Sequence, residues 1–163
     1  MGFTGDEQAG ERTRMIEIVE AKQASDELCA AFRSLIPQLT MASEVPTRDE
    51  LQTIIEAEAT KLLLAIDDSR GVRRIVGVLT LILYRIPTRK VARIEDVVVE
   101  HDARRQGIAE LLLRHALGLA RNAGTKSVDL TSNPDRVPAI RLYSKLGFVK
   151  WNTNLFRYSF HTT

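Results

Sequence analysis

The chain has 163 residues, of which 44% are hydrophobic and 27% charged, and these values are ordinary for one globular domain with a real core. Its formal net charge of +2 is too small to indicate a nucleic-acid or anionic-membrane partner. No apolar run approaches the ~20 residues that cross a bilayer, so we expect a soluble protein without a membrane partner.

The N-terminal residues 1–14 are polar and contain glycine, so we expect a flexible tail ahead of a single domain over residues 15–163. They contain no apolar signal core. Cys29 is the only cysteine, which excludes an intrachain disulfide and favours a cytoplasmic location. The three histidines have no ligand spacing with one another or with Cys29, and we therefore predict no bound metal.

The domain is expected to begin with one strand and two helices. Alternation of apolar residues predicts a strand over residues 15–21. The Ser-Asp pair at residues 25–26 offers an N-cap for a first helix, which we expect Pro37 to end. Residues 47–50 have the spacing of a capping box, which predicts a second helix to about residue 59.

Two apolar runs follow, at residues 62–66 and 75–84, with Tyr84 at the end of the second. They flank the turn signal DDSRG and predict an antiparallel hairpin. Pro87 cannot donate a hydrogen bond to a strand ladder, so we expect it to break the pairing before the next strand begins near Lys90.

The stretch from residue 94 to residue 113 organises the rest of the chain. An unbroken β-branched run at residues 97–99 predicts a strand that is covered on both faces. Helical spacing of apolar residues begins at Ile108, and Gly124 is a suitable residue just past the end of that helix. A strand therefore leads into a helix through a short polar turn.

The C-terminal part predicts a strand at residues 128–130, a turn in TSNPD and a short helix that closes at Gly147. A final strand pair is expected at residues 148–151 and 155–160. Its aromatic side chains could supply a homodimer surface. The mixed order of strands and helices indicates an α/β or α+β domain, with helices covering a central sheet.

The turn before the central helix has the features of an anion site. The first N–H groups of a helix have no partner within it, and the helix dipole adds partial positive charge there. Gly107 lets another group approach the backbone, and Arg104 and Arg105 can offer forked donors to phosphate oxygens. The ligand that these features imply is a diphosphate.

Two adjacent acids, Glu95 and Asp96, interrupt the apolar central strand. Strand alternation would direct one carboxylate to each face of the sheet, and a partly buried carboxylate tends toward a raised pKa. One of the two could act as a general base. The alternative is a structural ion pair with Arg93 or another cation.

Two motifs in this sequence resemble the GNAT superfamily of acetyl-CoA-dependent N-acetyltransferases. The first is the [QR]-x-x-G-x-[GA] pattern, with Arg104, Gly107 and Ala109 after the central strand. The second is RLYSKLGF, which contains Tyr143. The string IEDVVV is also similar to the corresponding strand of glucosamine-6-phosphate N-acetyltransferases.

The resemblance implies a GNAT-like α/β (mixed α+β) fold. In that fold a twisted, mostly antiparallel mixed sheet is splayed at its two central parallel strands and flanked by about four helices. It also implies that residues 38–51, between the first two helices, form one wall of the acceptor pocket. A plain helical hairpin without a role in substrate choice is the alternative for this segment.

The same resemblance implies the roles of individual residues. Glu95 would act as the general base, with Asp96 also serving the acceptor and Tyr84 contacting it. Tyr143 would protonate the departing thiolate, and Asn133 would lie near the pantetheine arm. The residues implied to contact acetyl-CoA are Val97, Val98, Val99, Arg104, Arg105, Gln106, Gly107, Ile108, Ala109, Asn133 and Tyr143.

The function implied is transfer of acetyl from acetyl-CoA to a primary amine of a small molecule, by direct attack in a ternary complex. Two alternatives remain at this point. The acceptor could be a protein N-terminus or lysine, or the chain could be a non-catalytic acyl-CoA-binding module.

Overall fold

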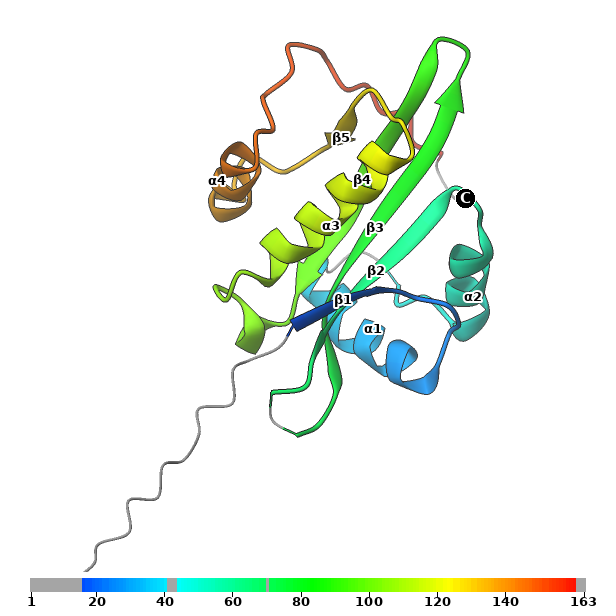
Figure 1. Ribbon diagram of the computed structural model, residues 1–163, viewed down its shortest axis with the longest axis vertical. Helices are drawn as coiled ribbons and strands as arrows, with labels where there is room; N and C mark the ends of the chain where they lie inside the picture. Colours follow the sequence, from blue (N-terminus) through cyan, green and yellow to red (C-terminus); the bar gives the residue numbers. More distant parts are fainter. Residues whose placement is uncertain (1–15, 41–43, 70, 161–163) are drawn as a thin grey trace, which may run out of the picture. The chain divides into compact units, whose positions relative to one another are not determined.

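The computed structural model describes residues 16–40, 44–69 and 71–160 (Figure 1). The predicted N-terminal tail and Met15 therefore lie outside the described residues. The chain divides into two compact units, the first ending at Thr131 and the second beginning at Ser132. Each unit is described by itself.

The first unit is built on a five-stranded sheet of order β1-β2-β3-β4-β5. Strands β1 to β4 pair antiparallel with their neighbours, and β5 pairs parallel with β4 (Figure 1). The predicted mixed, mostly antiparallel sheet and the predicted hairpin are thus confirmed. The strands are β1 (Ile16–Glu20), β2 (Thr60–Asp67), β3 (Arg74–Ile86), β4 (Arg89–Val99) and β5 (Val128–Leu130).

Helix α1 (Asp26–Leu39) begins at the predicted N-cap, where the Ser25 side chain accepts a hydrogen bond from the Leu28 N–H. The prediction that Pro37 ends this helix was wrong, because the helix continues to Leu39. A proline in the last turn removes only one backbone donor. The Thr40 N–H still donates to the Ile36 carbonyl at 3.0 Å, which closes the helix beyond the proline.

Helix α2 (Arg48–Glu56) confirms the predicted capping box between Thr47 and Glu50. The Thr47 N–H donates to Glu50 Oε2 at 2.7 Å, and the Glu50 N–H donates to Thr47 Oγ1 at 3.3 Å. The helix ends at Glu56, earlier than predicted. The reason is that Ala57 takes an extended conformation and its carbonyl accepts the Thr60 N–H, which turns the chain into β2.

The two faces of the sheet are covered by different helices. Alternate strand residues such as Leu62, Leu64 and Val78 join the buried side chains of α1 and α2 in one apolar core. On the opposite face lies α3 (Ile108–Asn122), since a Cβ on Gly77 would come within 3.3 Å of Leu112. The predicted helix from residue 108 to about residue 123 is confirmed.

The second unit contains α4 (Val137–Lys145), which is followed by Gly147 at φ +92° as predicted. The final strand pair was predicted wrongly, because residues 148–160 form no strand. Trp151, Phe156 and Phe160 are 77%, 88% and 89% exposed. Aromatic side chains favour a strand only when a neighbouring strand completes the ladder, and the described part of the chain supplies none here.

Within the described residues, no helix has the length and apolar character that crossing a membrane requires.

Candidate functional site

Strand β4 carries a β-bulge at Asp96. Thr80 pairs with Glu95 and Val78 pairs with Val98, so Asp96 and Val97 together face the single residue between Val78 and Thr80. Asp96 has φ +51°, in the left-handed region. Aspartate tolerates this region better than most side chains, but it still costs backbone strain. The bulge therefore places an acid in a strained position in the middle of the sheet.

Asp96 lines a cavity of about 160 Å³ between α1, α2 and the sheet. Thr80 on β3 and Glu44, ahead of α2, contribute polar groups. The surface of the wall is about equally polar and apolar, and its residues come from elements distant in sequence. The other lining residues are Phe32, Ile36, Leu39, Thr40, Pro46, Ile54, Leu62 and Val78.

The bulge changes the expected placement of the two acids. Directly paired residues of antiparallel strands project to the same face, so Glu95 lies on the side of Thr80, which lines the same cavity as Asp96. The two carboxylates therefore do not project to opposite faces, because the extra residue interrupts the alternation.

The two acids have different electrostatic settings. Asp96 is exposed as a whole residue, but partial burial of its carboxyl group raises its pKa, and the charge of neighbouring Glu95 raises it further. Glu95 does not line the cavity, and its Oε1 accepts a hydrogen bond from the Arg93 Nε. Asp96 is thus the acid with cavity access and a raised pKa, whereas Glu95 is held in an ion pair.

The turn between β4 and α3 has the expected strand–turn–helix geometry. After the 3₁₀ turn η1 (His101–Ala103), Arg105 has φ +62° and Gly107 has φ +79°. Gly107 is the N-cap of α3 and provides no side-chain cap. In the described chain, no backbone carbonyl or side chain accepts the N–H groups of residues 105–109. These amides are therefore available to an anion.

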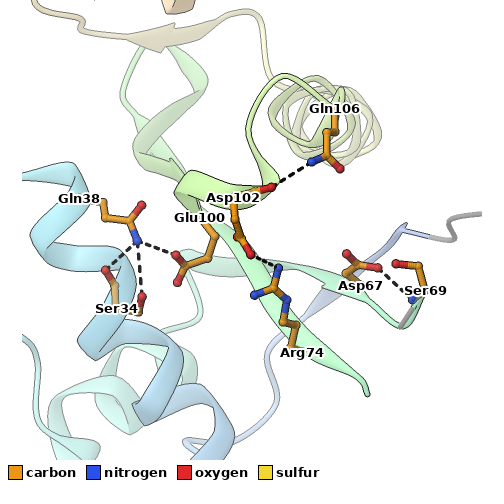
Figure 2. Close-up of polar contacts among 8 residues, drawn as sticks. All are labelled: Ser34, Gln38, Asp67, Ser69, Arg74, Glu100, Asp102 and Gln106. Atoms are coloured by element: carbon orange, nitrogen blue, oxygen red, sulfur yellow. Dashed lines mark hydrogen bonds and ion pairs between the residues drawn. The ribbon is translucent and has the colours of Figure 1, made fainter. Parts of the chain in front are cut away.

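Arg104 has partners within the protein. Its Nε donates to the Val99 carbonyl at 3.0 Å, and its Nη2 donates to Gln38 Oε1 at 3.2 Å. Gln38 in turn donates from Nε2 to Glu100 Oε2 at 2.6 Å and to the Ser34 carbonyl at 3.0 Å (Figure 2). The Arg104 side chain thus ties the end of β4 to the last turn of α1.

Two further polar contacts hold η1 in place. Gln106 Nε2 donates to the Asp102 carbonyl at 3.1 Å, and Arg74 Nη2 donates to Asp102 Oδ2 at 2.8 Å (Figure 2). Arg105 is exposed, and no described residue forms a hydrogen bond or ion pair with its side chain. Of the two predicted phosphate-binding arginines, Arg105 is therefore the one whose guanidinium has no partner among the described residues.

Strand β4 has an open edge next to this turn. Strand β5 pairs with β4 only from Ala92 to Ile94. Along residues 95–99, the described residues supply no strand partner on the side away from β3. Val98 and Val99 are buried, and Val97 is half-buried, so the open backbone edge lies in a largely apolar setting.

Tyr84 does not lie in the Asp96 cavity. It lines a separate hollow of about 480 Å³ together with Arg85 and Lys90, near the far end of the β3–β4 hairpin. The two hollows share no lining residue. The structure therefore does not place Tyr84 in the same cavity as Asp96, although both were predicted to contact the acceptor.

Two predicted site residues belong to the second unit. Burial raises the pKa of the Tyr143 phenol, and its ring meets Phe148 edge to face at a centroid distance of 5.9 Å. The Asn133 Oδ1 accepts the Asp135 N–H at 2.9 Å, which is the turn-forming role open to any asparagine.

Gln38 was expected only as part of the acceptor wall at residues 38–51, and its contact with Arg104 was not predicted from the sequence. Its partner Arg104 lies 66 positions away, and no local pattern indicates such a contact. Residues 41–43 of the predicted acceptor wall lie outside the described residues. In the described part of the chain, no cluster of three acidic, histidine or cysteine side chains could hold a metal, and Cys29 is a buried free thiol.

The sequence of the chain is similar to those of known acetyltransferases. The family model described as "Acetyltransferase (GNAT) family" matches residues 24–148. Human N-acetyltransferase 8 is 26% identical over 133 residues, 76% of this chain. Streptothricin acetyltransferase of Escherichia coli is 36% identical over 67 residues, 41% of this chain. The chain spans 59% and 38% of the lengths of these two proteins.

Solved structures show the same fold. A Trypanosoma brucei acetyltransferase has a TM-score of 0.71 at 26% identity, covering 90% of this chain and 100% of its own. The aminoglycoside N-acetyltransferase AAC(6')-Iy in complex with CoA has a TM-score of 0.73 at 16% identity, with coverages of 91% and 97%. Glucosamine-6-phosphate N-acetyltransferase from Arabidopsis thaliana has a TM-score of 0.71 at 18% identity, with coverages of 88% and 98%.

Proposed function

Because the chain belongs to the acetyltransferase (GNAT) family, we propose that it transfers an acetyl group from acetyl-CoA to a primary amine of a small molecule. The observation that carries this proposal is the placement of Asp96. A carboxylate with a raised pKa lies on a β-bulge in the wall of a cavity, in the strand whose open edge leads to an anion-binding turn.

The residues present suit the diphosphate of coenzyme A. Five consecutive amides, from residue 105 to residue 109, have no internal acceptor among the described residues, and the exposed Arg105 adds a cation. At Gly107, no atom lies within 4 Å of the position that a Cβ would take. We therefore propose that this turn binds the diphosphate mainly through its backbone, together with the side chain of Arg105.

The open edge of β4 suits the pantetheine arm. Backbone groups along Val97, Val98 and Val99 could hydrogen-bond to its amides, as a further strand would. The Val99 carbonyl already accepts the Arg104 Nε, so the other groups of this edge would carry the interaction. Bound acetyl-CoA would supply an activated acetyl thioester, and the protein would have to manage the proton of the amine.

An amine with a pKa near ~10 is about one part in a thousand neutral at pH 7, which corresponds to a penalty of roughly 4 kcal/mol. We propose that a carboxylate oxygen of Asp96 accepts the proton, directly or through water. The C–N bond forms as the thioester C–S bond breaks, and the nitrogen loses its second proton to solvent. The leaving thiolate takes a proton from the protein and departs as the thiol, and the protein donor regains its proton from solvent. Glu95 would act through its charge on Asp96, although its direct use as the base is the alternative.

Tyr143 is the proposed donor of the proton to the leaving thiolate. Its raised pKa keeps the phenol protonated at neutral pH, which a proton donor requires. Asn133 remains a proposed neighbour of the pantetheine arm. A cytoplasmic location and a homodimer remain predictions as well.

The proposal is tested with the full chain in two assays. Calorimetry should detect binding of coenzyme A, and free-thiol release from acetyl-CoA should depend on an added primary amine. Turnover only with peptides would instead indicate a protein acceptor. Binding of coenzyme A without turnover over a broad amine panel would indicate a non-catalytic module. Absence of binding would overturn the donor itself.

A further inference from the structure

The charges around the Asp96 cavity restrict the part of a substrate that can enter it. Glu44 and Asp96 are its only charged lining residues among those described, and both are acids. A primary ammonium group is attracted by this pair. A phosphate or carboxylate would enter against two negative charges with no cation to offset them, which is unfavourable at short range.

The apolar wall restricts the rest of the substrate. Phe32, Ile36, Leu62 and Val78 are buried core residues that also face the cavity. Apart from the two acids, only the hydroxyls of Thr40 and Thr80 offer hydrogen-bonding side chains in the described lining. A polyhydroxylated amine would find few side-chain partners there for its hydroxyl groups.

The size of the cavity sets a limit on the apolar group. Its volume is about 160 Å³. An apolar protein cavity of roughly 150 Å³ holds one benzene molecule. Pockets for drug-sized ligands are larger, at roughly 300–1,000 Å³. The cavity therefore has room for one small ring or one short branched alkyl chain.

We propose that the acceptor is a primary monoamine with a compact apolar body, such as a benzylamine or a branched alkylamine. Its nitrogen lies at Asp96 and its apolar group lies against Phe32 and Ile54. This inference rests on the proposed acetyl transfer and adds the class of amine. As in the proposed acetyl transfer, Asp96 takes a proton from the amine before the C–N bond forms.

The first test compares amines in the thiol-release assay with acetyl-CoA. We expect kcat/KM for benzylamine and isoamylamine to exceed those for glucosamine 6-phosphate and kanamycin by at least tenfold. A preference for the amino sugar or the aminoglycoside would overturn the inference, while leaving acetyl transfer to a small amine intact. Turnover with none of these amines, despite binding of coenzyme A, would overturn both.

The second test changes the size of the cavity. Ile54 and Ile55 are adjacent, partly buried residues of α2, but only Ile54 lines the cavity. We expect Ile54→Ala to raise kcat/KM for 1-naphthylmethylamine relative to benzylamine at least fivefold. Ile55→Ala is the matched control and should leave this ratio unchanged.

Fold and donor binding are monitored in the same variants. Thermal unfolding and the Kd for coenzyme A identify a variant that has lost its structure. The ratio of the kcat/KM values for two amines does not depend on the amount of active protein. An unchanged ratio in folded Ile54→Ala would show that the acceptor lies elsewhere and would overturn the inference.

Discussion

Asp96 combines two features that oppose folding. Its backbone lies at φ +51°, and its pKa is raised by burial and by the charge of Glu95. Backbone strain and an unfavourable ionised form at one position are typical of functional sites, where the rest of the structure compensates for both. These features make Asp96 the residue at which activity and stability should be most clearly opposed.

Replacing Asp96 by asparagine should separate activity from stability. The pKa of Asp96 is higher in the folded state than in the unfolded state. The ionised side chain therefore destabilises the folded state at pH values above the folded pKa. This destabilisation is lost as the pH falls through the folded pKa. Asparagine is uncharged and also tolerates a positive φ. We expect Asp96→Asn to have an unchanged or higher Tm at pH 7 and at least a ~10²-fold lower kcat/KM.

Differential scanning calorimetry and the thiol-release assay measure these two effects. Full activity of folded Asp96→Asn would exclude Asp96 as the base. A lower Tm that is independent of pH would exclude the electrostatic cause.

Glu95 should act on the proton affinity of its neighbour. Because its charge raises the pKa of Asp96, we expect Glu95→Gln to lower that pKa, as measured by carbon-13 NMR of the carboxyl group. Turnover should persist. Glu27→Gln removes the same charge from the exposed surface of α1 and should leave the pKa of Asp96 unchanged. Complete loss of turnover in folded Glu95→Gln would instead assign the base to Glu95.

At the scale of elements, α2 depends on its capping box. The helix has nine residues and a single fully buried side chain, Leu51, so its N-terminal hydrogen bonds matter. We expect Thr47→Ala to lower the free energy of unfolding by about 1 kcal/mol in urea denaturation. Thr53→Ala is the control. Its hydroxyl bonds only to the Asp49 carbonyl within the helix, and alanine favours helix, so little change is expected.

The capping box should also respond to pH. Hydrogen bonds from the Thr47 backbone and side chain lower the pKa of Glu50. Their contribution to the stability of the folded state is therefore fully present above the unfolded pKa of Glu50. It is lost as the pH falls through the lowered pKa of the folded state. The urea midpoints of wild type and Thr47→Ala should therefore differ less under strongly acidic conditions, where the Thr47 hydroxyl keeps only its bond from the Glu50 N–H. A difference that is constant with pH would assign the effect to the hydroxyl alone.

The contact of Gln38 with Arg104 links two elements with different proposed tasks. Helix α1 lines the Asp96 cavity proposed to bind the acceptor, and Arg104 belongs to the turn proposed to bind the diphosphate. We expect Gln38→Leu to weaken coenzyme A binding about fivefold in calorimetry, since one net hydrogen bond is worth about 1 kcal/mol. Gln23→Leu, an exposed change ahead of α1, should have no effect. Equal Kd values for Gln38→Leu and wild type would show that the turn is positioned without this link.

At the scale of the whole molecule, the residues proposed for catalysis come from both units. Tyr143 is in the second unit, whereas the cavity and the turn are in the first. We expect Tyr143→Phe to lower kcat at least tenfold with little change in the Kd for coenzyme A, because only the phenolic hydroxyl group is removed. Tyr158→Phe, an exposed change in the same unit, is the control. Unchanged kcat in Tyr143→Phe would assign the proton transfer to another group.

The sequence was sufficient for features that depend on a few neighbouring residues. The family resemblance read from Arg104, Gly107 and Tyr143 is confirmed by the match over residues 24–148, and the mixed sheet is confirmed by the strand pairing. The capping box at Thr47 and the N-cap at Ser25 formed as predicted. Caps and short turns are satisfied by local hydrogen bonds, so short patterns identify them.

Only the tertiary structure decided which acid meets the cavity, what Arg104 contacts and whether residues 148–160 become strands. The bulge at Asp96 is set by the pairing of β3 with β4, and the partner of Arg104 is a helix 66 residues away. Sheet register, cavity walls and the completion of a strand ladder depend on segments that are distant in sequence, and the local pattern is compatible with more than one arrangement. The sequence by itself thus determined the family, the order of most elements and the strand–turn–helix proposed to bind an anion, while long-range packing determined the surroundings of Asp96 in the proposed acceptor site.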